Sequence, residues 1–102
     1  MTHLVEINGD DGRIDYKFFE DLVSAENRYY RALGAVSQGV VVKDAEGKTV
    51  KLIACRLFDV PTEDPAEAKR LIANNEAVRL QDSDDRLCGD IIVLENLFRV
   101  LN

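Results

Sequence analysis

Residues 40–60 read VVVKDAEGKTVKLIACRLFDV, and this stretch decides the fold of the chain. Its three valines lead into a polar turn that contains Gly47, the residue type that adopts positive φ most easily. Residues 48–58 then form a second run, rich in β-branched and apolar side chains, which is typical of a β-strand. The stretch therefore predicts a β-hairpin, with elements of a different period on either side.

A helical pattern precedes the hairpin. Between Asp15 and Gly34 the apolar positions recur at intervals of three and four residues, which is the period of one helix face. These positions are Phe18, Leu22, Ala25, Tyr29 and Leu33. Asp15 is placed to cap the N-terminus of the helix, and Gly34 is a suitable residue to end it. We therefore expect a helix of ~18 residues over this range.

The chain before this helix contains a short alternating run, Leu4–Ile7, which we expect to be a strand. Asn8–Gly12 then interrupts the pattern. Asn-Gly is a strong reverse-turn signal, so one interpretation is a hairpin that returns through residues 13–16. The helical period that follows favours the other interpretation, a loop that joins the strand to the helix.

Two more elements are indicated after the central hairpin. Asp64, Pro65 and Glu67 form a helix start, with a cap, a proline at the first helical position and an acid at the third. We expect this helix to continue to about Asn75, because asparagine tolerates the left-handed conformation that ends many helices. Residues 77–81 alternate between apolar and polar side chains, and this pattern predicts a strand.

The C-terminal segment, residues 91–101, fits one helix face with Asp90 as its cap. Residues 91–94 alone would fit a buried strand equally well, and we expect a helix. The order is then β-α-β-β-α-β with an appended C-terminal helix. This is the ferredoxin-like, split βαβ arrangement, within a single α+β domain that spans residues 1–102. The sheet face without helices would need solvent-compatible residues, the C-terminal segment or a second subunit of a homo-oligomer to cover it.

The chain is acidic, with 19 Asp and Glu against 13 Lys and Arg and a formal net charge of -6. This balance disfavours contact with DNA, RNA or an anionic membrane, and a protein with a basic surface is the more natural partner. No run approaches the ~20 apolar residues of a membrane helix, and the N-terminus does not have the pattern of a secretory signal. Cys55 and Cys88 stand without motif spacing, which fits free thiols in the cytoplasm.

The sequence predicts no catalytic residue, no metal site and no cofactor. Residues 82–93 place several acids at positions of a calcium loop, but Leu87 and Val93 stand where Gly and a bidentate Glu are required. The single histidine, His3, lies near the N-terminus, where we expect it to be exposed. One histidine and two separated cysteines do not complete a zinc site.

These observations predict a non-enzymatic protein-binding or regulatory module, of the inhibitor or adaptor kind. Acidic residues would steer the association, and the apolar C-terminal segment would make direct contact. The predicted partner-binding residues are Asp82, Asp84, Asp85, Asp90, Leu97 and Phe98. Two alternatives stay open: a regulatory domain that binds a small ligand in a cleft at the sheet face, and a small enzyme that uses carboxylates.

Overall fold

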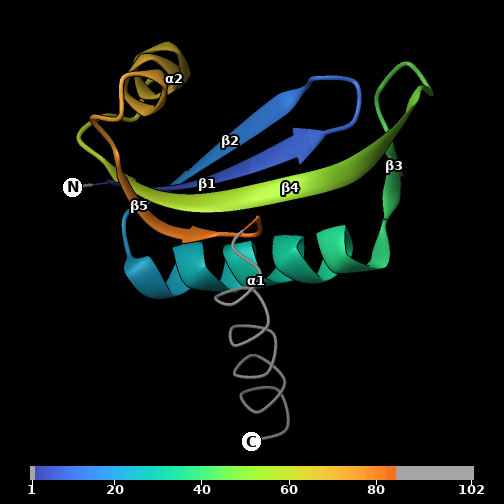
Figure 1. Ribbon diagram of the computed structural model, residues 1–102, viewed down its shortest axis with the longest axis horizontal. Helices are drawn as coiled ribbons and strands as arrows, with labels where there is room; N and C mark the ends of the chain where they lie inside the picture. The colour runs from blue at the N-terminus through green and yellow to red at the C-terminus, as the bar shows by residue number, and fades with distance from the viewer. Residues whose placement is uncertain (1, 85–102) are drawn as a thin grey trace, which may run out of the picture.

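The computed structural model describes residues 2–84 of the chain. These residues form a small α+β domain, in which an antiparallel sheet of five strands carries two helices (Figure 1). The elements are β1 (Thr2–Gly9), β2 (Ile14–Phe19), α1 (Leu22–Gln38), β3 (Val41–Lys43), β4 (Thr49–Val60), α2 (Pro65–Ala73) and β5 (Val78–Asp82). Residues 1 and 85–102 lie outside this description, and so does the expected C-terminal helix.

The expectation of a loop and a helix directly after β1 is wrong, because the chain turns back into β2. The Gly9 N–H donates a hydrogen bond to the Arg13 carbonyl (2.9 Å), and Gly12 adopts φ 88° within this turn. β2 then pairs antiparallel with β1 along its whole length. Asn8 and Gly9 are the last residues of β1, so the Asn-Gly pair itself does not form the turn; residues 10–13 form it, with Gly12 at the position of positive φ.

α1 begins and ends later than the spacing predicts. Asp21 caps it, because the Asp21 carboxylate accepts a hydrogen bond from the Ser24 amide (2.9 Å). Gly39 ends it in the left-handed conformation, at φ 65°. The two residues expected at the helix ends lie elsewhere: Asp15 is in β2, and Gly34 is inside α1.

The second half of the described chain follows its local signals. β3 and β4 form the expected hairpin, with Gly47 at φ 80° in the turn. Asp64 caps α2 by accepting a hydrogen bond from the Ala66 amide (3.3 Å), and Pro65 is the first helical residue. Asn75 adopts the left-handed conformation after α2, at φ 58°, and β5 follows close to its expected range.

Most of the sheet is built on β4. The strand order is β2-β1-β4-β3, β5 also pairs with β4, and every pair is antiparallel. A β-bulge interrupts the pairing of β1 with β4, because consecutive residues of β1 lie opposite Ala54 and Leu52. Ile53 is the extra residue, and it shifts the alternation so that Leu52 and Cys55 both face α1.

The two helices pack on opposite faces of the sheet (Figure 1). α1 covers the face that carries Val5 and Leu57. α2 covers the other face, where Ala68 packs with Leu4 and Phe58. Neighbouring residues of one strand point to opposite faces, so each of β1 and β4 contributes to two separate cores.

This topology differs from the expected ferredoxin-like order, β-α-β-β-α-β. The described chain runs β-β-α-β-β-α-β, because β2 precedes the first helix. The helices are also divided between the two faces, whereas the expected arrangement leaves one face without a helix. The physical reason lies in β1: Leu4–Ile7 are all buried, so this strand needs a cover on both faces.

Gly9→Ala should destabilise the domain, because the added Cβ would overlap the Cγ1 atom of Val50. We expect the free energy of unfolding to fall by ~1–3 kcal/mol, the usual cost of overpacking. Gly34→Ala is the matched control. Gly34 lies inside α1 with open space around it, so the same change should raise stability by ~0.4–1 kcal/mol. Urea denaturation of the three proteins measures both effects, and equal stabilities would contradict the close packing at Gly9.

Candidate functional site

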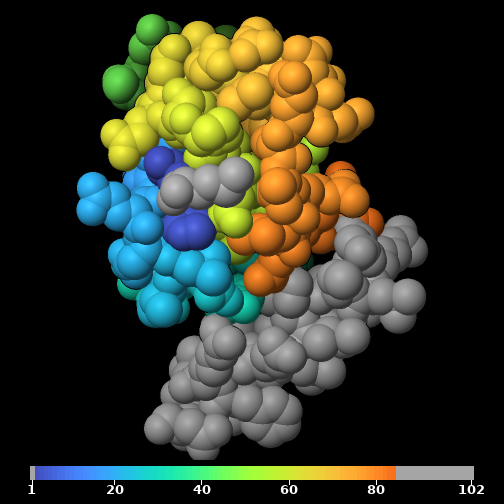
Figure 2. Space-filling model, turned by 90° about the vertical axis from the view of Figure 1, so that its left-hand side faces the viewer, coloured from blue at the N-terminus to red at the C-terminus, as the bar shows by residue number. Residues whose placement is uncertain are grey.

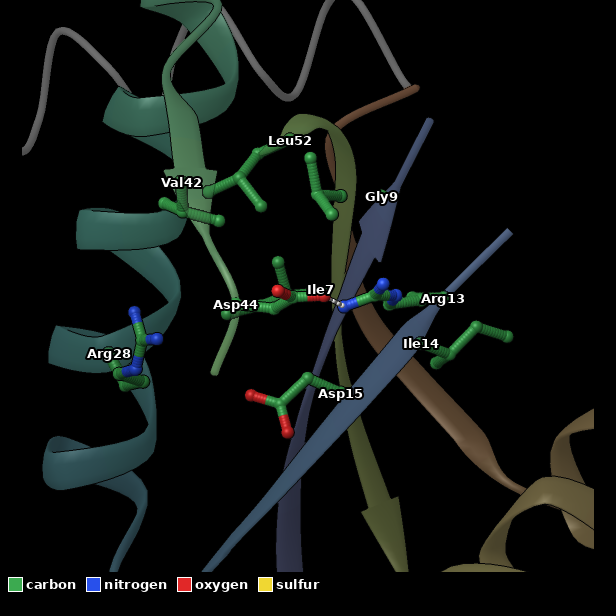
Figure 3. Close-up of a pocket in the computed structure, with 10 residues that line it drawn as sticks. Ile7, Gly9, Arg13, Ile14, Asp15, Arg28, Val42, Asp44 and Leu52 are labelled. Atoms are coloured by element: carbon green, nitrogen blue, oxygen red, sulfur yellow. Dashed lines mark ion pairs between the residues drawn. The ribbon is translucent and has the colours of Figure 1, made fainter. Parts of the chain in front are cut away.

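A cavity of about 400 Å³ opens on the α1 side of the sheet, between α1 and the two hairpins. Its apolar lining comes from four strands and consists of Ile7, Ile14, Val42, Val50 and Leu52. Gly9 and four charged side chains complete the lining (Figure 3), and the charged residues are Arg13, Asp15, Arg28 and Asp44. A mainly apolar hollow with a few polar groups is typical of a small-molecule site.

An ion pair joins the two hairpins across this cavity (Figure 3). Nη1 of Arg13, in the β1–β2 loop, lies 2.6 Å from a carboxylate oxygen of Asp44, in the β3–β4 turn. Asp44 also accepts hydrogen bonds from the backbone amides of Lys48 (2.8 Å) and Glu46 (2.9 Å). The bond from Arg13, followed by that from Lys48, holds the pKa of the Asp44 carboxyl below its ordinary value. Asp44 therefore stays ionised and links its own turn to the first hairpin.

Arg28 and Asp15 border the same cavity in a different way. Arg28 is half-buried on α1, and Asp15 is exposed on β2. Figure 3 shows the two side chains on facing sides of the hollow. Within residues 2–84 neither side chain forms a hydrogen bond or an ion pair. The cavity thus presents one positive and one negative group that are not neutralised by described neighbours.

The opposite face of the sheet carries a buried polar cluster around Glu6. The Glu6 side chain is only 1% exposed, and its Oε1 lies 2.7 Å from Nε and 2.6 Å from Nη2 of Arg56. Asn8 donates a further hydrogen bond to Oε1 (3.0 Å), whereas Oε2 has no partner in the described chain. Burial, followed by the nearby Glu6 charge, raises the pKa of Tyr16. The guanidinium of Arg56 compensates a carboxylate that could not be buried alone.

Two of the predicted partner-binding acids, Asp82 and Asp84, lie within the described residues, and they differ in burial. Asp82 is the last residue of β5 and is 8% exposed. Its carboxylate pairs with Nη1 of Arg79 (3.0 Å) and accepts a hydrogen bond from the Asp84 amide (2.9 Å). Asp82 is therefore a structural acid, not part of the solvated loop that the sequence suggests. Asp84 is exposed and borders a second hollow, of about 450 Å³, on the Arg56 side of the sheet. The other predicted residues, Asp85, Asp90, Leu97 and Phe98, lie outside the described residues.

Two groups that often serve in catalysis have structural contacts instead. His3, expected to be exposed, is partly buried in β1 and pairs with the Asp59 carboxylate. Cys55 is buried, and this burial raises the pKa of its thiol from 9.0 to about 12, so little thiolate forms near neutral pH. In the described range, no group of three or more His, Cys, Asp or Glu residues is placed to hold a metal ion.

A scan against models of known protein families, a search of curated proteins and a search of solved structures each find no match. Among residues 2–84, no helix is both long and apolar enough to cross a membrane. The function is therefore inferred from the geometry and charges of the chain itself.

Sequence reasoning missed the cavity and the Glu6–Arg56 pair, because both are assembled from segments far apart in the chain. Arg28 comes from α1 and Asp15 from β2, a strand whose spacing resembles a helix. One signal for the buried pair is visible in the sequence. Glu6 stands inside the apolar run Leu4–Ile7, where its neighbours are core residues.

Arg56→Ala should destabilise the domain strongly, because it leaves the buried Glu6 carboxylate without a counter-charge. We expect a loss of ~3–5 kcal/mol in the free energy of unfolding, as when a buried pair is broken from one side. Arg70→Ala breaks exposed pairs with Glu67 and Glu76 and should change the free energy of unfolding far less. Replacing Glu6 and Arg56 together with Met should recover most of the loss. Equal costs for the two arginine variants in urea denaturation would contradict the burial of Glu6.

Cys55 should resist thiol reagents in the native state. In a Cys88→Ser variant Cys55 is the single cysteine of the chain, and its labelling should wait for unfolding. The raised pKa also predicts a pH dependence. The unfolded thiol ionises above 9.0 and the folded one near 12, so the stability linked to this proton is complete below pH 9.0 and is lost as the pH rises towards 12. Cys55→Ala should remove this part of the alkaline decline in denaturation curves, and rapid native labelling would contradict the burial.

Proposed function

We propose that the chain is a non-enzymatic, cytoplasmic protein-binding module, of the inhibitor or adaptor kind, that engages a partner with a basic surface. The partner would contact the outer edge of β5 and the acidic and apolar segment that follows this strand. The observation that supports the proposal best is β5 itself, an edge strand with exposed apolar side chains.

β5 has the properties of a strand that can accept another strand. Within residues 2–84 it pairs with β4 alone, so no described strand lies along its other edge. Val78 and Leu80 are 50% and 40% exposed, and Figure 2 shows β5 at the surface in orange. An edge of this kind offers backbone N–H and C=O groups to an extended segment of a partner, and the exposed side chains add apolar contact.

The charge of the chain supports a basic partner. Residues 82–102 contain five acidic and two basic residues, a net charge of -3. Asp84 is exposed just after β5, and four further predicted contact residues follow in the sequence: Asp85, Asp90, Leu97 and Phe98. In this proposal residues 91–101 form the helix that their spacing indicates, and Leu97 and Phe98 lie on its apolar face. Exposed acids beside an apolar contact favour fast and selective association with a basic surface.

Replacing two exposed apolar residues of β5 with lysine tests this proposal. The tagged full chain is expressed in the source cell, and the captured proteins are quantified by mass spectrometry. Val78→Lys with Leu80→Lys should reduce capture of a specific partner at least ~10-fold, because the change removes apolar contact and repels a basic surface. Val23→Lys with Val41→Lys is the matched control, since these valines are exposed even more and lie on α1 and β3. The control should capture the partner as the wild type does.

Binding kinetics with the purified partner separate charge from apolar contact. Asp84→Asn should slow association and flatten its salt dependence, because exposed charges act over ~8 Å at physiological ionic strength. Leu97→Ala with Phe98→Ala should speed dissociation instead. A partner that the β5 variant and its control retain equally would contradict the proposal. A wild-type chain that captures no protein beyond the background would contradict it as well.

A further inference from the structure

The cavity between α1 and the hairpins has a charge pattern that the protein-binding proposal does not use. Arg28 and Asp15 border it from facing sides, and neither is paired within residues 2–84 (Figure 3). The two other charged residues of the lining, Arg13 and Asp44, neutralise each other at 2.6 Å. The rest of the lining is largely apolar. This pattern fits a ligand that carries one negative group, one positive group and an apolar body.

We propose that this cavity binds a free α-amino acid with a large apolar side chain. The ligand carboxylate would accept hydrogen bonds from the guanidinium of Arg28, whose planar fork of donors matches a carboxylate. The ligand ammonium would lie against Asp15. The side chain of the ligand would contact the apolar wall, which Val42, Val50 and Leu52 form.

Simpler ligands fit the lining less well. A carboxylic acid without an ammonium group would leave Asp15 unpaired and close to a second negative charge. An amine without a carboxylate would leave Arg28 half-buried and unpaired. A phosphate would approach both Asp15 and Asp44. The volume of about 400 Å³ lies inside the usual range of small-molecule sites, roughly 300–1,000 Å³.

The cavity wall is tied together without a ligand. Besides the Arg13–Asp44 pair, the Asp10 N–H donates to the Lys51 carbonyl (2.9 Å), and the Lys51 N–H donates to the Asp10 carboxylate (3.1 Å). These bonds connect the loop of the first hairpin to β4. A wall that is already in place lowers the cost of binding, because fewer groups have to be ordered.

Calorimetric titration of the full chain with related compounds tests the two charge contacts separately. L-Leucine and L-phenylalanine should bind, whereas L-glutamate and L-lysine should not. L-Leucinamide lacks the carboxylate, and 4-methylpentanoate lacks the ammonium group. Each should bind at least ~10-fold more weakly than L-leucine, the usual effect of losing a hydrogen bond to a charged group.

Two variants assign these contacts to residues. Arg28→Gln should weaken L-leucine at least ~10-fold and leave L-leucinamide unchanged, since the amide has no carboxylate to lose. Asp15→Asn should weaken L-leucine in the same way and leave 4-methylpentanoate unchanged. A purely structural role for either side chain would weaken every ligand alike. Arg31→Gln and Glu20→Gln are the matched controls, because both side chains are exposed and neither lines the cavity.

Three outcomes would overturn the proposal. The first is equal affinity for L-leucine and 4-methylpentanoate, which would indicate an acid site. The second is an affinity for L-leucine that neither Arg28→Gln nor Asp15→Asn changes, and the third is the absence of binding by both amino acids at millimolar concentration. Thermal unfolding checks that each variant is folded, and the ligand series on the wild type tests the proposal if one is not. The Val78→Lys, Leu80→Lys protein should bind L-leucine normally, so this result and the partner experiment are independent.

Discussion

β4 pairs with three strands and also contributes side chains to both helix-covered faces of the sheet. The rest of the structure depends on how one strand meets these two requirements. β1 lies along one edge, while β3 and β5 share the other at different heights. The bulge at Ile53 makes this arrangement compatible with burial. If Ile53 were paired regularly and no bulge formed, Lys51 and Thr49 would face α1, so that charged and polar side chains would replace part of the apolar cavity wall. The bulge therefore determines which side chains line the cavity on the α1 side.

The Glu6–Arg56 pair constrains the pairing of β1 with β4 from the opposite face of the sheet. Glu6 lies directly opposite Arg56 in the pairing of β1 with β4. A slip of one residue would place the Glu6 carboxylate on the α1 side, among side chains such as Leu57 that offer no counter-charge. The energetic cost of that error, ~3–5 kcal/mol, is a substantial fraction of the ~5–15 kcal/mol that stabilises a typical domain. We infer that the pair contributes more to the choice of register than to the depth of the native free-energy minimum.

The parts of the fold that could be predicted are those that local chemistry decides. The turn at Gly47 and the Asp64-Pro65 helix start each depend on neighbouring residues, and both are confirmed. The hairpin that contains β2 is one of two interpretations of the sequence, and the incorrect one is favoured because Phe18 in the strand and Leu22 in the helix happen to be four residues apart. The candidate site escapes prediction for a related reason. Arg28 and Asp15 border the same cavity only because a helix and two hairpins pack together, and no residue spacing within one segment indicates that arrangement.

The position of β1 in the middle of the sheet has a consequence for synthesis on the ribosome. β1 can pair with β2 as soon as the first hairpin emerges, but its other edge pairs with a strand that ends at Val60. At ~5–20 residues per second, several seconds of translation separate these two events, whereas hairpins form in microseconds. During that interval the edge of β1, with Leu4–Ile7 not yet enclosed, is open to other nascent chains. The domain therefore passes through a stage at which chaperones and neighbouring polypeptides compete with β4 for the same strand.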